Sequence, residues 1–453
     1  MTAALAPEPT APAASVLDAR HRTATTGIVL VVTLLAFEAM SVGTVMPVLA
    51  RDLDGLPLYA WGFSATLISG LLTTVLGGGW VDRSGPGRPL LAGLAVFVAG
   101  LAVAGAAPAM AVFIGGRVLQ GLGTGVAMVA VYVLIARAYP EELRPRVFAA
   151  LAAAWVLPSL VGPAVGGFVA EHAGWRWVFL GLIPLVVPAA AMLLPALRDL
   201  RPADGPPAPV SRSRYLAAVA AAAGAGAFLY GIDDVTVPHL LLATAGIAGI
   251  AAGLPRLLPA GALRMRRGLP SVVLVRGLLA GAFFGMDAFI PLALTGLHGF
   301  GAAQAGVALT VGALGWSGAS QIQGRSARPR AFFVRLGAAL VTLGIAGVVV
   351  ALEFSGWATV PAWTVGGAGM GFAISSLSVL TLDASPEGEQ GANSAALQIA
   401  DQLGSSLIVG AAGAVVAALG AARLGAGVAV SGAAFAAVAA VALAASFRLE
   451  ARP

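Results

Sequence analysis

Five ionisable side chains fall inside long apolar stretches of this sequence, and they are the first candidates for chemistry. They are Glu38, Arg117, Arg276, Asp287 and Asp401. A charged group surrounded by hydrocarbon is expensive, so a residue of this kind is a functional hypothesis by default. A carboxyl group in such a place can take up and release a proton near neutral pH unless a basic side chain pairs with it. The pattern therefore points to the handling of protons or cations inside a membrane.

Glu38 and Arg117 are expected to meet. Glu38 lies near the middle of the first apolar stretch, where it is placed for coupling to protons or substrate. Arg117 lies within the fourth stretch, where an unpaired guanidinium would be costly, so a carboxylate partner is required and Glu38 is the first choice. The alternative is a permanent structural ion pair. Gln120 follows three residues later and is assigned to the same substrate cavity.

The remaining charged candidates lie in the second half of the chain. Asp287 could bind a cationic substrate, carry a proton or be wetted by an outer vestibule. Asp401 stands between Gln398 and Gln402, which suits either a polar cavity wall or hydrogen bonds between helices. It is also a candidate for proton coupling, together with Glu38, Arg117 and Asp287. Arg276 lies close to the end of its stretch, so its long side chain is expected to reach the membrane interface.

Few aromatic residues are available to shape a binding cavity. Trp155, Trp316, Trp363 and Phe289 could line a cavity for a hydrophobic substrate. Residues near the ends of the apolar stretches are expected to anchor them at the membrane interface. These anchors are Tyr59, Trp61, Trp175 and Trp177.

The elements that must position these residues are transmembrane helices. The chain has 453 residues, of which 59% are hydrophobic and only 10% charged, too few charges to cover a soluble protein of this size. Apolar runs of about twenty residues recur, and each is long enough to cross a bilayer as a helix. The expected helices are 26–49, 60–80, 89–107, 110–136, 146–169, 176–196, 214–231, 238–259, 270–295, 302–322, 331–353, 357–380, 391–419 and 426–447.

The arginines predict the topology. With the N-terminus inside and fourteen passes, 21 arginines fall on the inner side and three, Arg51, Arg176 and Arg423, on the outer side. Both termini are therefore expected in the cytoplasm. The predicted parts are a disordered tail (1–25), a six-helix bundle (26–196), a cytoplasmic linker (197–213), two additional helices (214–259), a second six-helix bundle (260–447) and a short tail (448–453). The location is the inner (plasma) membrane.

Several classes of function are excluded. The chain has no cysteine, so disulfides and thiol chemistry are absent. Its four histidines are isolated and give no metal-ligand spacing. No phosphate-binding loop and no nucleophile, base and acid set appears, so no enzyme, cofactor or metal is expected. The excess of arginine is explained by arginines in loops on the inner face of a membrane protein, so nucleic acid is not expected as a partner.

A weak internal repeat has an offset of 244 residues. It pairs Pro47, Leu53, Gly55, Gly62 and Thr66 with Pro291, Leu297, Gly299, Gly306 and Thr310. Each set spans the end of one expected helix, an outer loop and the start of the next. Duplicated halves around a central site are how many secondary transporters are built.

The segment that closes the second expected helix resembles a signature of the major facilitator superfamily. The residues are Gly78, Asp82, Arg83, Gly85 and Arg88. The resemblance implies a cytoplasmic latch in which the aspartate pairs with arginines or a helix N-terminus across the inner face. The two residues before Arg88 are not basic, unlike the family's pattern.

Two further segments resemble signatures of the same family. The run from Arg117 to Gly121 is similar to the signature whose arginine is linked to proton coupling, and Gly125 continues a small-residue spacing. The fifth expected helix resembles the signature of exporters that exchange substrate for protons. Its matching residues, which are expected to form a tight, kinked contact, are Gly162, Pro163, Gly166 and Gly167.

Glu38 also stands nine residues before Pro47, as the acidic residue does in the fourteen-helix drug:proton antiporter branch. The resemblance implies an all-α polytopic fold of two six-helix bundles plus two central helices. A monomer is expected. It implies export of lipophilic or cationic drugs, dyes or secondary metabolites in exchange for protons, by alternating access. Nutrient import or lipid export on the same fold remain open, and a membrane-embedded enzyme or sensor is less favoured.

Overall fold

The computed structural model describes residues 16, 18, 21–198, 212–386 and 389–450, and every regular element in these ranges is a helix. The predicted linker 197–213 and most of the two predicted tails lie outside the described residues. The N-terminal group contains α1 (Arg22–Asp52), α2 (Trp61–Ser84), α3 (Gly87–Gly105), α4 (Met110–Ala138), α5 (Arg144–Val169), α6 (Arg176–Leu180), α7 (Ile183–Ala191) and α8 (Leu194–Arg198).

Two more groups follow along the chain. A helical hairpin consists of α9 (Arg212–Gly231) and α10 (Val237–Leu257). The C-terminal group contains α11 (Leu269–His298), α12 (Ala302–Arg325), α13 (Arg330–Leu352), α14 (Thr359–Asp383), α15 (Gln390–Leu419) and α16 (Leu424–Ala445). Each stretch expected to be helical contains a helix, and most boundaries differ from the prediction by only a few residues.

The sixth expected helix is the exception, because 176–196 is broken into α6, α7 and α8. Pro184 opens α7, Pro188 lies inside it, and Pro195 is in the first turn of α8. A proline lacks a backbone donor and its ring crowds the preceding turn, so successive prolines interrupt a continuous helix.

Successive long helices run in opposite directions, while α6, α7 and α8 together follow one direction, so the bundle has two ends. We call the end where α1 begins and α16 finishes the terminal end, and the opposite end the distal end. Eleven helices of the described chain are long and apolar enough to cross a membrane, judged by length and composition. The shorter Arg176–Ala191 stretch, α9 and α12 are not in that set. Fourteen passes with both termini in the cytoplasm therefore stay a prediction.

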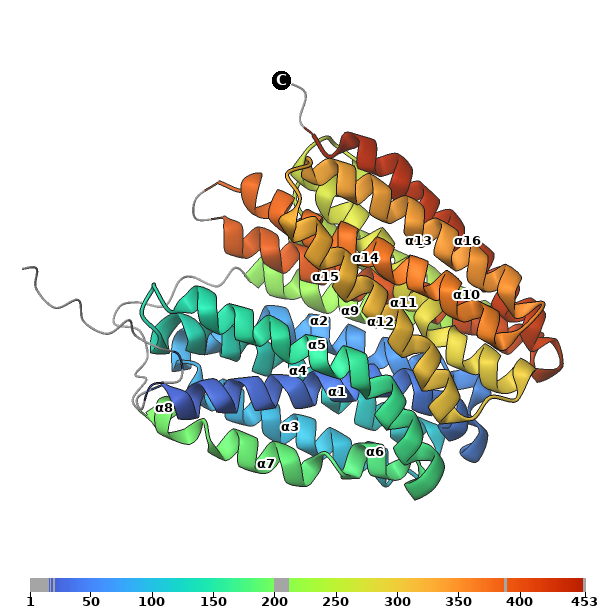
Figure 1. Ribbon diagram of the computed structural model, residues 1–453, viewed down its shortest axis with the longest axis horizontal. Coiled ribbons are helices and arrows are strands. Elements are labelled where there is room, and N and C mark those ends of the chain that lie inside the picture. The colour runs from blue at the N-terminus through green and yellow to red at the C-terminus, as the bar shows by residue number, and fades with distance from the viewer. Residues whose placement is uncertain (1–15, 17, 19–20, 199–211, 387–388, 451–453) are drawn as a thin grey trace, which may run out of the picture.

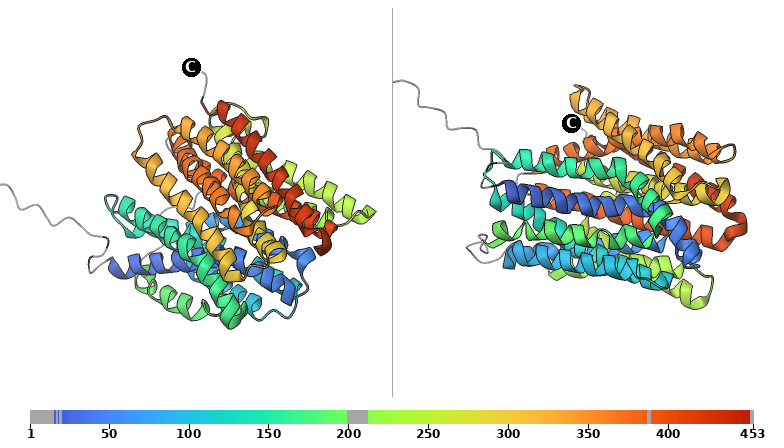
Figure 2. Two further views of the ribbon diagram at one scale, coloured as in Figure 1. Left: turned by 45° about the vertical axis from the view of Figure 1, so that its right-hand side comes forward. Right: turned by 60° about the horizontal axis from the view of Figure 1, so that its bottom comes forward.

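The two large groups are inclined to each other. Figure 1 shows the N-terminal group below the C-terminal group, and the two are closer together at the right, where the distal ends lie. The turned views in Figure 2 show the same inclination (left) and the long helices running side by side (right). In the described part of the chain, three direct hydrogen bonds join the groups in the distal half. They are from Tyr59 Oη to the Ala288 carbonyl (2.8 Å), from Ser64 Oγ to the Ser406 carbonyl (2.9 Å) and from Ala303 N–H to Glu171 Oε2 (3.2 Å).

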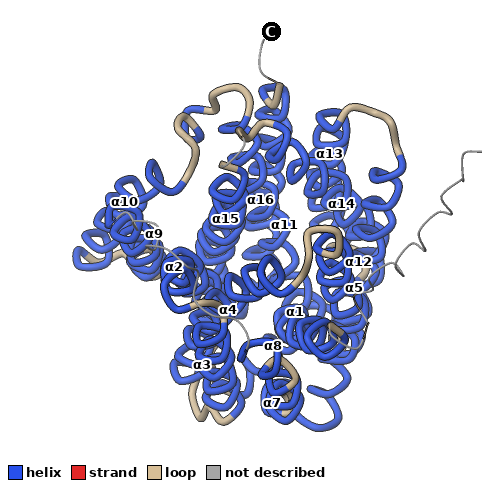
Figure 3. Tube along the Cα trace, turned by 90° about the vertical axis from the view of Figure 1, so that its left-hand side faces the viewer, coloured by secondary structure: helices blue, strands red, loops and turns tan. Residues whose placement is uncertain are grey.

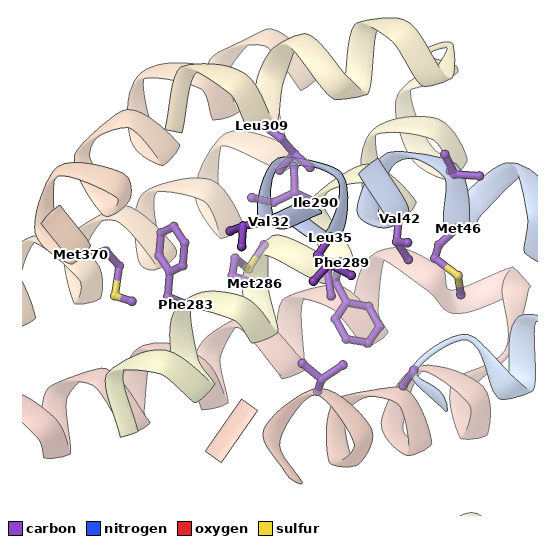
Figure 4. Packing of buried hydrophobic residues seen from close by; sticks show 14 of the residues in the cluster. Val32, Leu35, Val42, Met46, Phe283, Met286, Phe289, Ile290, Leu309 and Met370 are labelled. Carbon is purple, nitrogen blue, oxygen red and sulfur yellow. The ribbon is translucent and has the colours of Figure 1, made fainter. Parts of the chain in front are cut away.

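Apolar side chains fill the space between α1 and α11. Figure 4 shows Val42 of α1 near Phe289 of α11, with Met46 further along α1 and Ile290 at the next position of α11. All four are buried, with no more than 1% of their surface exposed. This dry contact holds the two groups together beside the cavity described below.

The α9–α10 hairpin lies beside α2, at the edge of the bundle (Figure 3). Its two helices approach closely because they meet through small residues, among them Gly224, Gly246 and Gly253. Ala217 and Ala221 of α9 belong to a buried cluster with Leu71 of α2 and residues of α15. The hairpin therefore covers the seam between α2 and α15, where the two groups meet.

The predicted disordered tail is wrong at its C-terminal end, because α1 begins at Arg22 and not at 26. The Thr25 hydroxyl donates to the carbonyl of Val16 (2.6 Å) and lies 2.8 Å from Tyr139 Oη. The His21 ring stacks on Tyr139. These contacts add a first turn to the helix. At the other end of the chain, Leu449 lies in the predicted tail 448–453 but is buried.

Two of the expected interface anchors are also corrected. Trp175 is buried and its ring N–H donates to Asp52 Oδ2 (2.8 Å), so it joins α1 to the start of α6. Tyr59 is buried between the two groups, where its ring packs against Phe63 and Phe289. Both side chains found protein partners that a pattern of helix ends does not reveal.

Candidate functional site

A cavity of about 570 Å³ lies between the two large groups, and we call it the central cavity. α1 and α5 line it on the N-terminal side, and α11, α12 and α14 line it on the C-terminal side. Its walls are mostly apolar, with a few polar groups, as is usual for small-molecule sites. The polar and charged lining residues are Ser159, Arg276, Asp287 and Ser317.

Aromatic rings form much of the cavity wall. Trp155, Trp316 and Trp363 line it, as the sequence predicted, together with Phe283 and Phe284. Phe283 stacks on Trp363 with ring centroids 4.4 Å apart and meets Trp316 edge-on at 5.6 Å. Whether any of these rings touches a substrate stays a prediction. The rings support one another, so they present a preformed surface to an aromatic or cationic molecule.

Of the described residues that line the cavity, Asp287 is the one carboxylate. Among the described residues, no arginine or histidine lies within ion-pair distance of it. It belongs to α11, one residue before Ala288, whose carbonyl accepts from Tyr59. The side chain is half-buried and lies one turn beyond Phe283 and Phe284. An anionic group therefore stands beside an aromatic wall.

The prediction that Arg276 reaches the membrane interface is wrong, because its side chain points inward. Its guanidinium forms a two-pronged ion pair with Asp401 of α15, from Nε to Oδ1 and from Nη2 to Oδ2, both 2.7 Å. Nη1 also lies 3.2 Å from both the Ile374 carbonyl and the Ser378 hydroxyl of α14. The α11 backbone directs this side chain inward, towards an acceptor set that satisfies it better than the interface would. Arg276 lines the central cavity, and Asp401 stands behind it.

Glu38 and Arg117 are brought together by α1 and α4, as the sequence predicted. The Arg117 guanidinium donates to Glu38 Oε1 and to the side-chain oxygen of Gln120, and its Nε donates to the Gly62 carbonyl (2.8 Å). The side chains of Glu38 and Arg117 are 4% and 5% exposed. The pair is thus enclosed by the N-terminal group and is not part of the cavity wall. Its role in proton coupling stays a prediction.

Besides Glu38, four other predicted cavity residues are not on the cavity wall in this structure. Phe289 is fully buried and packs against Tyr59 and Phe435. Gln120 is fully buried and lies against Gly100 of α3. Gln398 is exposed, and Gln402 lies near Gly70 of α2. The reason is helix rotation, because residues three or four apart share a face while their neighbours point elsewhere.

The glycines of α5 form the tight contact that the sequence predicted. A β-carbon at Gly166 would clash with Ser41 of α1, and one at Gly167 would clash with the Ala302 carbonyl of α12. The Ser41 hydroxyl donates to the Gly162 carbonyl (3.0 Å), and the Thr44 hydroxyl lies 3.1 Å from the Pro163 carbonyl oxygen. These glycines let α5 contact α1 and α12 at the distal end of the cavity.

Gly121 and Gly125 play the same part between α4 and α2. A β-carbon at either glycine would clash with backbone oxygens of α2, those of Thr66 and Gly70 respectively. The close approach fixes α4 against α2. It therefore also fixes Arg117, which lies one turn earlier.

The segment that closes α2 lies at the terminal end. Gly85 has a positive φ of 74°, which ends the helix, while Asp82, Arg83 and Arg88 are exposed. Within the described part of the chain, Asp82 makes no ion pair or hydrogen bond. No atom outside its own helix lies near the β-carbon position of Gly78. The latch implied by the resemblance therefore stays a prediction.

Sequence reasoning missed several cavity residues. Met40, Phe283, Phe284 and Ser317 line the cavity and were not singled out. Phe283 and Phe284 could have been found from their spacing of three and four residues from Asp287, which places them on the same side of one helix. Met40 and Ser317 carry no comparable signal. No group of three His, Cys, Asp or Glu side chains that could hold a metal occurs in the part of the chain that the structure describes.

Comparisons with known proteins agree with this architecture. Over 210 residues, the chain is 33% identical to a probable multidrug-efflux transporter of Mycobacterium tuberculosis. That alignment covers 46% of this chain and 44% of the relative. Over 181 residues, it is 29% identical to the multidrug transporter protein MdtP of Bacillus subtilis, which covers 40% of this chain and 33% of the relative. The matched region thus spans less than half the length of these relatives.

Solved structures show the same fold. An auto-inhibited peptide transporter of the POT family superposes with a TM-score of 0.65 at 17% identity, covering 93% of this chain and 96% of that one. A POT family transporter in complex with 5-aminolevulinic acid superposes with a TM-score of 0.66 at 12% identity, covering 95% and 97%. The family model of the Major Facilitator Superfamily matches residues 28–409. The chain therefore belongs to the Major Facilitator Superfamily.

Proposed function

We propose that this transporter exports small lipophilic or cationic molecules in exchange for protons. The observation that carries the proposal is the central cavity, in which Asp287 stands unpaired beside a wall of tryptophan and phenylalanine rings. The names of the mycobacterial and Bacillus relatives, which describe multidrug transporters, point in the same direction.

The charges at the cavity favour a cation. The charge of Arg276 is offset by Asp401 at 2.7 Å, which leaves the Asp287 carboxylate as the uncompensated charge on the wall. An anion in a low-dielectric cavity attracts a cation more strongly than it would in water. The rings of Trp155 and Trp316 add cation–π attraction and apolar contact area. A lipophilic cation would satisfy both parts of the wall at once.

We infer that protons are coupled through Glu38 and Arg117. When Glu38 is ionised, it neutralises Arg117 inside the N-terminal group. Protonation of Glu38 would leave Arg117 without its counter-charge, so the packing of α1 against α4 would change. That change would favour one of two conformations, which is the requirement for coupling to transport. The Arg276–Asp401 pair is a second candidate of the same kind, in the C-terminal group.

The proposed arrangement in the membrane has fourteen passes, both termini in the cytoplasm and a monomer as the working unit. The predicted parts are the bundles 26–196 and 260–447, with the additional helices 214–259 between them. The distribution of arginines supports this orientation in the inner membrane. The terminal end would then face the cytoplasm, and the contacts at the distal end would close the cavity to the outside.

The test uses everted vesicles with an acidic lumen and a pH-sensitive dye. Addition of a lipophilic cation should relieve the quenching of the dye in the wild type, because protons leave as substrate enters. Glu38→Gln should abolish the response. Asp287→Asn should weaken it for cations and retain it for neutral drugs. Asp234→Asn, an exposed carboxylate outside the cavity, is the matched control and should behave as wild type.

Two results would count against the proposal. The first is no response to a broad panel while a control exporter is active in parallel, which would favour nutrient uptake or lipid transport. The second is a normal response of Glu38→Gln, which would remove Glu38 from the coupling path.

A further inference from the structure

The end of α5 contains a local change of helix type that directs a carboxylate towards the other group. Residues Ala170–Gly174 form a π-helical turn directly after α5, and Gly174 closes it with φ of 94°. Single π turns inside helical segments occur frequently at functional sites. Glu171 lies in this turn and reaches α12 of the C-terminal group.

The N-terminus of α12 receives this carboxylate. The backbone N–H of Ala303 donates to Glu171 Oε2 (3.2 Å). The first amides of a helix have no partner inside it, and the helix dipole makes this end attractive to anions. The N-cap residue is Gly301, which has no side-chain oxygen of its own to offer. Glu171 therefore supplies from the opposite group what the α12 sequence lacks.

Gly301 also provides the space. A β-carbon at this position would lie 3.0 Å from both carboxylate oxygens of Glu171. The φ of Gly301 is −71°, which any residue can adopt, so the backbone conformation does not require glycine here. A methyl group here would crowd the Glu171 carboxylate, which would have to shift by a few tenths of an ångström.

The nearby charged groups are engaged elsewhere. Nδ1 of His172 lies 3.0 Å from the Phe168 carbonyl, and its ring stacks on that of Phe168. Arg176 pairs with Asp52 of α1 at 3.0 Å. On α12, the Gln304 side chain accepts from the backbone N–H of Gly301 (3.0 Å). The α12 N-terminus is thus the favourable electrostatic partner that the structure gives Glu171.

We propose that Glu171 is a latch that holds the distal end of the α5–α12 seam closed. The inference builds on the alternating access of the proposed function, in which this seam must part when the distal end opens. Gly167 and Gly306 let the backbones of α5 and α12 touch next to the Glu171 contact. Opening of the distal end would separate this backbone contact and the Glu171 contact together. The carboxylate must leave the helix N-terminus at that step, which makes its attraction a direct contribution to the balance between the two conformations.

The experiment measures the distance across the distal end in the purified, reconstituted full-length protein. Because the chain has no cysteine, spin labels at Ala109→Cys and Ser355→Cys report one distance, between exposed positions on the two groups. Removing the charge with Glu171→Gln, or the whole contact with Glu171→Ala, should raise the ratio of long to short distances by about two- to fivefold. Gly301→Ala should act in the same direction, because its methyl group displaces the carboxylate.

Glu353→Gln is the matched control, since it removes an exposed carboxylate directly after α13 at the same end. The latch is overturned if the Glu171 and Gly301 variants leave the distance ratio unchanged, or if the control shifts it equally. The measurement needs neither substrate nor a proton gradient. The two proposals can therefore fail separately. A shift in the spin-label distances of the Glu171 variants would support the latch, even if the vesicle assay showed no substrate-dependent proton movement and so contradicted the exporter function.

Discussion

The ion pair between Arg276 and Asp401 allows a quantitative test of how the C-terminal group is held together. Its side chains are 15% and 23% exposed, so it lies between a surface pair and a fully enclosed one. Exposed pairs contribute about 0–1 kcal/mol, while removing one partner of a buried pair costs about 3–5 kcal/mol. We therefore expect a coupling energy of about 2 kcal/mol between the two residues.

The single variants should differ. Asp401→Asn retains an oxygen that can accept from Arg276, so it should lower the free energy of unfolding by about 1–2 kcal/mol. Arg276→Gln leaves the carboxylate alone and also gives up the donors to Ile374 and Ser378, so its effect should be about 3 kcal/mol. The double variant should be no less stable than Arg276→Gln, because Asp401→Asn removes the carboxylate that Arg276→Gln alone leaves unpaired.

The assay is a double-mutant cycle on the unfolding of the detergent-solubilised protein by sodium dodecyl sulfate. Arg335 and Glu450 provide a matched control cycle, since they form a longer pair of 3.6 Å in which Glu450 is 63% exposed. That cycle should give less than about 1 kcal/mol. Additive effects at Arg276 and Asp401, or equal coupling in both cycles, would refute the reasoning.

Three further predictions follow from contacts described above. Gly306→Ala should lower the free energy of unfolding by about 1–3 kcal/mol, because the added methyl group clashes with the Pro163 carbonyl; Gly318→Ala, at an open position, should change it little in the same denaturation assay. Trp316→Ala should weaken the binding of a lipophilic cation by about 1 kcal/mol in a direct binding assay, whereas the exposed Trp177→Ala should not. Partial burial raises the pKa of Asp233, so the folded protein binds a proton at this carboxyl group more tightly than the unfolded protein does. The free energy of unfolding should therefore fall as the pH rises through the pKa of Asp233 in the folded protein. In the pH dependence of the unfolding midpoint, Asp233→Asn should remove this fall and the control Asp234→Asn should retain it.

The sequence predicted the succession of helices well, because their apolar runs are long. Its errors have local causes. Prolines at 184, 188 and 195 interrupt the sixth stretch, and the contacts of Thr25 with Val16 and Tyr139 start α1 earlier. Hydropathy registers neither effect, since proline breaks a helix without making it polar, and a first turn can be held by neighbours far along the chain.

The contacts of the candidate site could be predicted only where a buried charge required a specific partner. Arg117 needed a carboxylate, and Glu38 was the acidic residue near mid-membrane in the same group. Arg276 had an alternative in the membrane interface, so its pairing with Asp401, 125 residues away, could not be deduced. Phe289 and Phe283 are both aromatic residues of α11, and only the rotation of that helix sends one into the core and the other to the cavity.

The position of the α9–α10 hairpin has an evolutionary consequence. None of the residues that line the central cavity belongs to it. Its helices are joined to the rest through small side chains against α2 and α15 and through the hydrogen bond from Trp61 to Asp233. Its sequence can therefore drift, within the need for small residues at those contacts, without changing which cargo the cavity selects. Selection for a new cargo would act on the cavity-lining helices α1, α5, α11, α12 and α14 and would leave the hairpin unchanged.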